Sequence, residues 1–166
     1  MFTRTAVPTS KTENNMSSTI VRHETPGAMK EAWAREFSEA IEIPAGAKYI
    51  VLSGVGALPS NPDAEPHTVA QFGDTRAQTK SVLDQISHIL GSKGYTLGDV
   101  VAVQAIFVGD PANNGKPDYE GFSSVYLEYF GSTTQPNLPT RTRSQVVGLV
   151  EPGWLVEVTV TAAKTA

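Results

Sequence analysis

Apolar residues recur along this chain with two different periods, which predicts a protein of mixed strands and helices. Residues 100–108 are rich in β-branched and aromatic side chains, and residues 154–162 alternate apolar with polar positions, so both segments predict strands. Residues 82–90 and 119–130 carry apolar side chains three or four positions apart. That spacing predicts two amphipathic helices, each with one face directed at a core.

Shorter segments complete the predicted order of elements. Residues 37–43 and 49–52 predict two strands joined by a short turn. Residues 141–149 predict a further strand, which would form a hairpin with 154–162 through the turn Val150-Glu151-Pro152-Gly153. The predicted order is therefore β-β-α-β-α-β-β. It favours an α+β fold with one sheet and both helices packed on one face.

The first predicted helix carries recognisable end signals. It opens near Asp74, where Thr75 and Gln78 have the spacing of a capping box. Gly94 is the candidate residue for its C-terminal end, where a left-handed backbone conformation favours glycine.

The first 30 residues differ from the rest of the chain. They are rich in Ser, Thr, Asn and Pro without a sustained period, which predicts a flexible segment, and Met16 is a second candidate start. Residues 31–166 are expected to form a single domain. The N-terminus has no apolar run typical of a signal peptide, so we expect a cytoplasmic protein.

Composition narrows the possible chemistry. The chain has no cysteine, which excludes thiol nucleophiles, disulfides and thiolate zinc sites, and its three histidines are scattered without metal-ligand spacing. We therefore expect no metal. The formal net charge is -4 and no basic run occurs, so no nucleic-acid partner is expected. No apolar run is long enough to span a membrane.

Two arginines are the leading candidates for a binding site. In an extended strand alternate side chains share a face, so Arg141, Arg143 and Gln145 point the same way. Two guanidinium groups on one face repel each other unless an anion lies between them. A ligand carboxylate would serve, since arginine binds carboxylates through two parallel hydrogen bonds. The alternative is a solvated strand edge with ordinary surface ion pairs.

Glu157 is the second candidate. It lies on the polar face of 154–162 and could hold and polarise a water molecule, or it could be a surface charge. In a simple hairpin Arg141 would pair near Ala162 and Glu157 near Val146, which are positions on opposite faces. A bulge, or a site shared between subunits, would then be needed to unite Arg141 with Glu157.

Six segments, in order, resemble the Rid family of YjgF-type imine deaminases. The strongest similarity is Pro139-Thr140-Arg141-Thr142, followed by Gly148-Leu149, Pro152-Gly153 and Leu155-Val156-Glu157-Val158. The other similar segments are Phe37-Ser38-Glu39-Ala40-Ile41, Tyr49-Ile50-Val51-Leu52-Ser53-Gly54, Asp74-Thr75-Arg76-Ala77-Gln78-Thr79, Gly98-Asp99-Val100-Val101 and Tyr126-Leu127-Glu128-Tyr129-Phe130. The resemblance covers roughly residues 35 to 163.

The resemblance implies a chorismate-mutase-like fold and a homotrimer whose sheets form a central barrel with three clefts between subunits. It implies that Arg141 grips the carboxylate of a 2-imino or 2-enamino acid and that Glu157 positions the water that attacks the imine carbon. Ammonia would leave and a 2-keto acid would remain, with no cofactor required. The implied ligand-binding residues are Phe37, Ser53, Gly54, Val55, Ser123 and Arg143.

Four of these positions depart from the family pattern. Phe37 stands where the family has tyrosine, Val55 replaces glutamine, Ser123 replaces asparagine, and Arg143 replaces a small residue or cysteine. The pair Arg141 and Arg143 favours an acidic substrate, such as an aminomuconate-like dicarboxylate. The departures leave two alternatives: a different reaction in the same cleft (tautomerisation, hydration or ring chemistry), and a non-catalytic ligand-binding protein.

Overall fold

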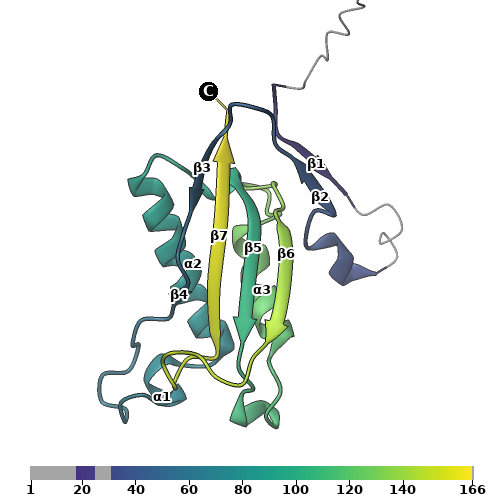
Figure 1. Ribbon diagram of the computed structural model, residues 1–166. Helices are drawn as coiled ribbons and strands as arrows, with labels where there is room; N and C mark the ends of the chain where they lie inside the picture. The colour runs from purple at the N-terminus through teal and green to yellow at the C-terminus, as the bar shows by residue number, and fades with distance from the viewer. Residues whose placement is uncertain (1–17, 25–30, 166) are drawn as a thin grey trace, which may run out of the picture.

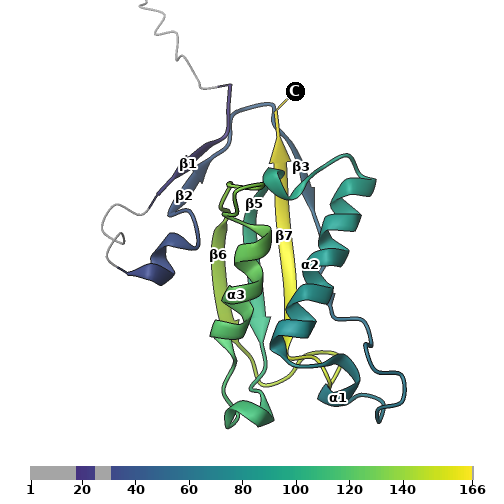
Figure 2. The same cartoon turned by 180° about the vertical axis from the view of Figure 1, so that it is seen from behind.

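A computed structural model describes residues 18–24 and 31–165, which form a five-stranded sheet with its long helices on one face (Figures 1 and 2). The sheet contains β3 (Lys48–Val51), β4 (Val55–Gly56), β5 (Val100–Phe107), β6 (Thr140–Gln145) and β7 (Val156–Lys164). The helices are α1 (Val69–Phe72), α2 (Thr75–Ser92) and α3 (Tyr119–Tyr129), and short 3-10 turns are η2 (Ala32–Arg35), η3 (Leu97–Asp99) and η4 (Pro111–Asn113). The predicted α+β fold is confirmed.

The order of strands across the sheet is β3-β7-β5-β6, with β4 also paired to β7. β5 runs antiparallel to β7 and parallel to β6, to which α3 connects it. The predicted hairpin between the last two strands is therefore wrong, because β5 lies between them. The physical reason is composition: β5, with the sequence VVAVQAIF, is apolar except at Gln104 and takes the centre, whereas β6, with the sequence TRTRSQ, suits an edge.

The core lies between the sheet and the two long helices. Val156, Val158 and Val160 of β7 face α2 and α3, and the side chains between them face away from the helices. No helix covers this second face in either view (Figures 1 and 2). Tyr49 and Val51 of β3 lie on it and are 53% and 69% exposed. We call this surface the open face.

The ends of α2 correct one expectation and confirm another. Asp74 is the N-cap, since its side chain accepts a hydrogen bond from the Ala77 amide, and Gln78 forms no capping box. The fully buried Gln78 amide instead donates to the Gly73 and Gly153 carbonyls and accepts from the Leu155 amide. It therefore ties α2 to the segment entering β7. Gly94 has a φ of +76° and ends the helix as predicted.

The predicted strands at 37–43 and 49–52 exist as β2 (Ala40–Glu42) and β3, but they do not form a hairpin. β2 pairs with β1 (Val21–His23) in a separate two-stranded sheet, while β3 pairs with β7. Most of the N-terminal segment predicted to be flexible lies outside the described residues. Its described part contains β1, which composition did not indicate. Arg22 of β1 donates hydrogen bonds to the Leu138 and Gly98 carbonyls and so ties the small sheet to the main body.

Candidate functional site

The predicted site residues fall into two groups within one copy of the chain. The first, which we call the arginine cluster, consists of Arg141, Arg143, Phe37 and Ser123 together with Glu36, Tyr119 and Tyr126. The second, the glutamate group, consists of Ser53, Gly54, Val55 and Glu157.

Arg141 is the centre of the arginine cluster. Its side chain is only 1% exposed, and it points from β6 toward α3 on the helix side of the sheet. The guanidinium carbon lies 4.8 Å from the Tyr126 ring centre and 5.3 Å from that of Phe37, so the cation contacts two aromatic rings. Nη2 donates to Glu36 Oε2 at 2.7 Å. This buried guanidinium therefore already holds a carboxylate, and the carboxylate belongs to the protein.

Ser123 and Arg143 extend the same network. The Ser123 hydroxyl donates to Glu36 Oε2 at 2.7 Å, and Arg143 Nη1 donates to the Ser123 oxygen at 3.2 Å. The Arg143 guanidinium lies over the Tyr119 ring, 5.2 Å from its centre. Burial first, and then the neighbouring Arg141, lower the pKa of Arg143 below its usual range. Two cations thus lie beside one carboxylate, which leaves the cluster with an excess of positive charge.

Two buried polar atoms in this cluster lack a hydrogen-bond partner among residues 18–24 and 31–165. They are Arg141 Nη1 and the Tyr126 hydroxyl oxygen. Burial also raises the pKa of the Tyr126 phenol far above its usual range, so the group stays neutral and can donate a proton to an acceptor. Buried donors are normally paired, so such exceptions are expected where a ligand or water binds.

The unpaired hydroxyl leads to a prediction for Tyr126→Phe. The ring stacks on Phe122 and Phe130, and phenylalanine preserves that packing. Because the lost hydroxyl is buried without a partner, we expect the free energy of unfolding to stay equal or to rise by about 1 kcal/mol. Urea unfolding of both proteins measures this. A loss above that size would mean that the hydroxyl has a partner in the folded protein.

Glu157, the central residue of the glutamate group, lies on the other face of the sheet from Arg141. Glu157 alternates with the core residues Val156 and Val158, so its side chain points to the open face. β4 pairs with β7 here, and any side chain at position 54 would overlap the Glu157 carboxylate. Glycine at 54 therefore makes room for Glu157. Ser53 is exposed, whereas Val55 pairs with Val158 and is half-buried against the core, so its side chain points to the helix side and away from Glu157.

Arg141 and Glu157 are separated within one copy by sheet face and by strand position. β6 is the strand at one edge, whereas β4 and β7 lie on the far side of β5 from it. Arg141 is level with Val103 and Val160, and Glu157 is level with Ile106 and Ser144. The predicted conflict of faces is therefore real, although the hairpin from which it was argued does not form.

The sequence did not identify three members of the arginine cluster: Glu36, Tyr119 and Tyr126. The helical spacing of residues 119–130 predicts core packing for Tyr126, which does lie in the core, but its ring also lies against Arg141. Glu36 directly precedes Phe37, the first residue of a segment already singled out. A carboxylate next to that segment is the one feature of the sequence that indicates Glu36. The contact itself depends on the fold, because Glu36 and Arg141 are 105 residues apart in the sequence.

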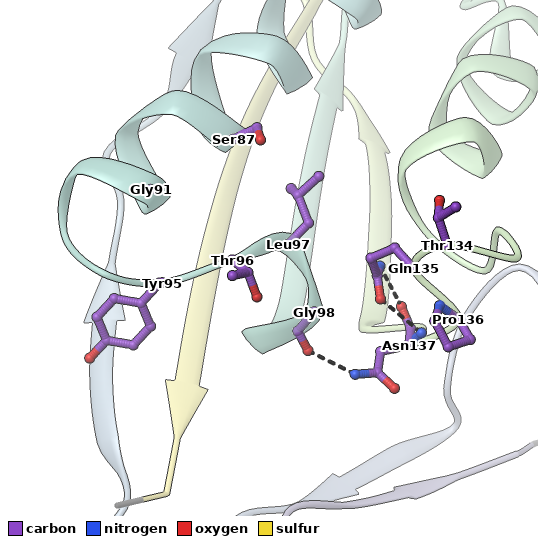
Figure 3. A pocket seen from close by; sticks show the side chains of 10 residues that line it. All are labelled: Ser87, Gly91, Tyr95, Thr96, Leu97, Gly98, Thr134, Gln135, Pro136 and Asn137. Atoms are coloured by element: carbon purple, nitrogen blue, oxygen red, sulfur yellow. Dashed lines mark hydrogen bonds between the residues drawn. The ribbon is translucent and has the colours of Figure 1, made fainter.

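A separate hollow of about 480 Å³ lies near the C-terminal end of α2 and contains none of the predicted site residues (Figure 3). Gln135 and Asn137 close one side of it, with Asn137 donating to the Gly98 carbonyl. Within the described part of the chain, no three His, Cys, Asp or Glu side chains gather closely enough to hold a metal ion. None of the described helices is long and apolar enough to cross a membrane.

Fold and site together define a small α+β protein with a buried, aromatic-flanked arginine that holds a carboxylate. Residues 27–164 match the model of the family described as Endoribonuclease L-PSP, and the chain belongs to this family, which is that of the Rid and YjgF proteins. The predicted family is therefore confirmed.

Individual relatives agree with this assignment. The chain is 38% identical over 109 residues to the 3-aminoacrylate deaminase RutC of Acinetobacter baylyi, which covers 66% of this chain and 74% of that protein. The fold of the present chain is similar to that of a Rid-family protein of unknown function from Yersinia pestis, with a TM-score of 0.61 and 23% identity. The similarity covers 86% of this chain and 98% of that protein. An uncharacterized protein from Pseudomonas aeruginosa gives a TM-score of 0.53 and 25% identity, with coverage of 88% and 99%.

Proposed function

We propose that this protein hydrolyses the imine or enamine of a small carboxylate to a keto acid and ammonia. One observation carries the proposal: Arg141 is a buried guanidinium that lies against two aromatic rings and already holds a carboxylate at 2.7 Å. A site that accepts Glu36 in this way has the donors and the enclosure that a ligand carboxylate requires. The relationship to a 3-aminoacrylate deaminase supports the same chemistry, since that relative's substrate is a small carboxylate with an amino group.

The proposed reaction gives Arg141 and Glu157 each a role. Arg141 binds and orients the substrate carboxylate. Glu157 accepts a proton from a water molecule while the water oxygen bonds to the imine carbon. The proton then passes to the nitrogen as the carbon–nitrogen double bond becomes single, which gives a carbinolamine. A second proton moves from the new hydroxyl group to the nitrogen while the carbon–nitrogen bond breaks, so that ammonia leaves and the carbon–oxygen double bond of the keto acid forms. These steps consume one water and require no cofactor.

This chemistry requires Arg141 and Glu157 in one cleft, which one copy of the chain does not provide. We propose a homotrimer in which the open faces pack together and the arginine cluster of one copy meets the glutamate group of the next. The exposed Tyr49 and Val51 on the open face support such a contact. Sedimentation that shows a stable monomer at micromolar concentration would contradict it. A cytoplasmic location stays a prediction.

We further propose that the substrate is a dicarboxylate, because the Arg143 guanidinium adds a second positive charge beside Arg141. Arg143→Ala is expected to lower kcat/KM for a dicarboxylic imine by about tenfold, which corresponds to one charge-assisted hydrogen bond. The same variant should leave a monocarboxylic imine nearly unchanged. Equal losses on both substrates would assign Arg143 a structural role through Ser123 rather than a role in substrate choice.

The function itself is tested with imines generated in place. An amino-acid oxidase produces 2-iminobutyrate or 2-iminopropionate, and release of the keto acid is followed with and without the protein. Acceleration above the spontaneous rate supports imine hydrolysis. No acceleration with these imines or with a dicarboxylic imine would contradict it and favour the alternatives, another reaction in the same cleft or ligand binding without turnover.

A further inference from the structure

Glu36 pairs with only one of the two terminal nitrogens of Arg141. A carboxylate normally meets arginine through two parallel hydrogen bonds, one to each terminal nitrogen. Here Glu36 Oε2 takes Nη2 alone, and its second hydrogen bond comes from the Ser123 hydroxyl. Nη1 remains buried without a partner among the described residues. The internal pair is therefore a weaker arrangement than the one that a free carboxylate could form.

Glu36 is also placed so that it can leave. Its side chain is 15% exposed, whereas that of Arg141 is 1% exposed. Glu36 follows the short turn η2, outside the sheet and the long helices, while Arg141 is held in β6. A rotation of the Glu36 side chain would carry its charge into solvent without any change in the sheet. Arg141 cannot move in the same way because its side chain is buried against the rings of Phe37 and Tyr126.

We propose that Glu36 is a built-in competitor for the ligand carboxylate, and that it determines which acids this site accepts. This inference rests on the proposed function. A ligand carboxylate displaces Glu36, takes Nη2 and Nη1 together, and gains the hydrogen bond that Glu36 does not make. An acid that can offer only one oxygen gains nothing over Glu36 and is rejected. The site thereby selects small acids whose carboxylate can lie flat against the guanidinium.

The test measures binding of 2-oxobutyrate, a stable keto acid, by isothermal titration calorimetry. Glu36→Gln keeps the size of the side chain and removes the competing charge. We expect it to bind 2-oxobutyrate about tenfold more tightly than the unmodified protein, because one charge-assisted hydrogen bond no longer has to be broken. Glu39→Gln removes the same charge from an exposed position three residues away and serves as the control. It should bind within about twofold of the unmodified protein, as expected of a solvated charge.

Further outcomes separate this inference from the proposed function. If Glu36→Gln binds no more tightly than the unmodified protein while Arg141→Ala abolishes binding, the competitor role is wrong and the carboxylate site stands. If Arg141→Ala binds as well as the unmodified protein, both proposals fail. If none of these proteins, Glu36→Gln included, binds 2-oxobutyrate, both fail as well.

A second measurement uses a chain with Glu36 intact, so that it does not depend on how the variant folds. Trp33 of η2 stacks on Phe37, with ring centres 6.2 Å apart, and Phe37 lies under Arg141. Displacement of Glu36 should therefore change the surroundings of Trp33. We expect saturating 2-oxobutyrate to change the tryptophan fluorescence and Trp33→Phe to remove that change. Trp154, the other tryptophan, packs on Phe72 and lies six residues before Val160, the β7 residue level with Arg141. Binding without a Trp33 signal would overturn the displacement of Glu36.

Discussion

Replacing Arg141 by alanine is expected to weaken ligand binding and kcat/KM by about ten- to a hundred-fold or more. The substitution removes a charge-assisted contact from an enclosed site, and such contacts contribute about 1.5–3 kcal/mol each. Titration calorimetry with 2-oxobutyrate and the imine assay measure the two quantities separately. Arg141→Lys is the matched control: an ammonium cannot present two parallel donors, so we expect it to restore little.

Stability provides a further check on Arg141→Ala. The substitution leaves the Glu36 carboxylate with only the Ser123 hydroxyl, and it removes the group packed between Phe37 and Tyr126. We expect the free energy of unfolding to fall by about 1–3 kcal/mol. A change within about 0.5 kcal/mol, together with unaltered binding, is the behaviour of an ordinary surface charge. That result would mean that Arg141 does not bind the ligand and that family membership informs only about the fold.

Glu157→Gln is expected to slow imine hydrolysis by about a hundred- to ten-thousand-fold while 2-oxobutyrate binding persists. The amide is a poor acceptor for a proton from water, and positioned general bases contribute factors of this size. Glutamine has nearly the same shape, so the space above Gly54 remains filled and the fold should be unchanged. The assay compares single-turnover rates with those of Glu128→Gln, an exposed acid on α3. Equal rates for both variants would remove Glu157 from the mechanism.

The variants Arg141→Ala and Glu157→Gln together also test the proposed trimer. Arg141 and Glu157 lie on opposite faces of one sheet, so a single copy cannot act on one small molecule with both. If the cleft is shared, mixing inactive Arg141→Ala with inactive Glu157→Gln subunits should restore part of the activity, since some mixed trimers contain a cleft with both native residues. Absence of recovery after verified subunit exchange would contradict a shared cleft.

Local pattern determined much of this protein. Side chains two residues apart share a face of a strand, so Arg141 and Arg143 were predicted to point the same way, and both contact α3 residues. The same rule predicted that Glu157 leaves the core. Helical spacing predicted α2 and α3, and Gly94 was predicted at the end of α2 because a left-handed backbone favours glycine. Each of these features depends on neighbours in sequence.

Tertiary structure decided what depends on distant partners. The position of β5 between β6 and β7 follows from burying its apolar residues, and this depends on a competition among strands that no single segment reveals. Gln78 has the spacing of a capping residue, but it bonds to residues 153 and 155 because they pack against it. Glu36 meets Arg141 across 105 residues for the same reason. The spacing of side chains along a strand or helix determines which face of that element each one points from. Which residue it meets there depends on how the whole chain packs.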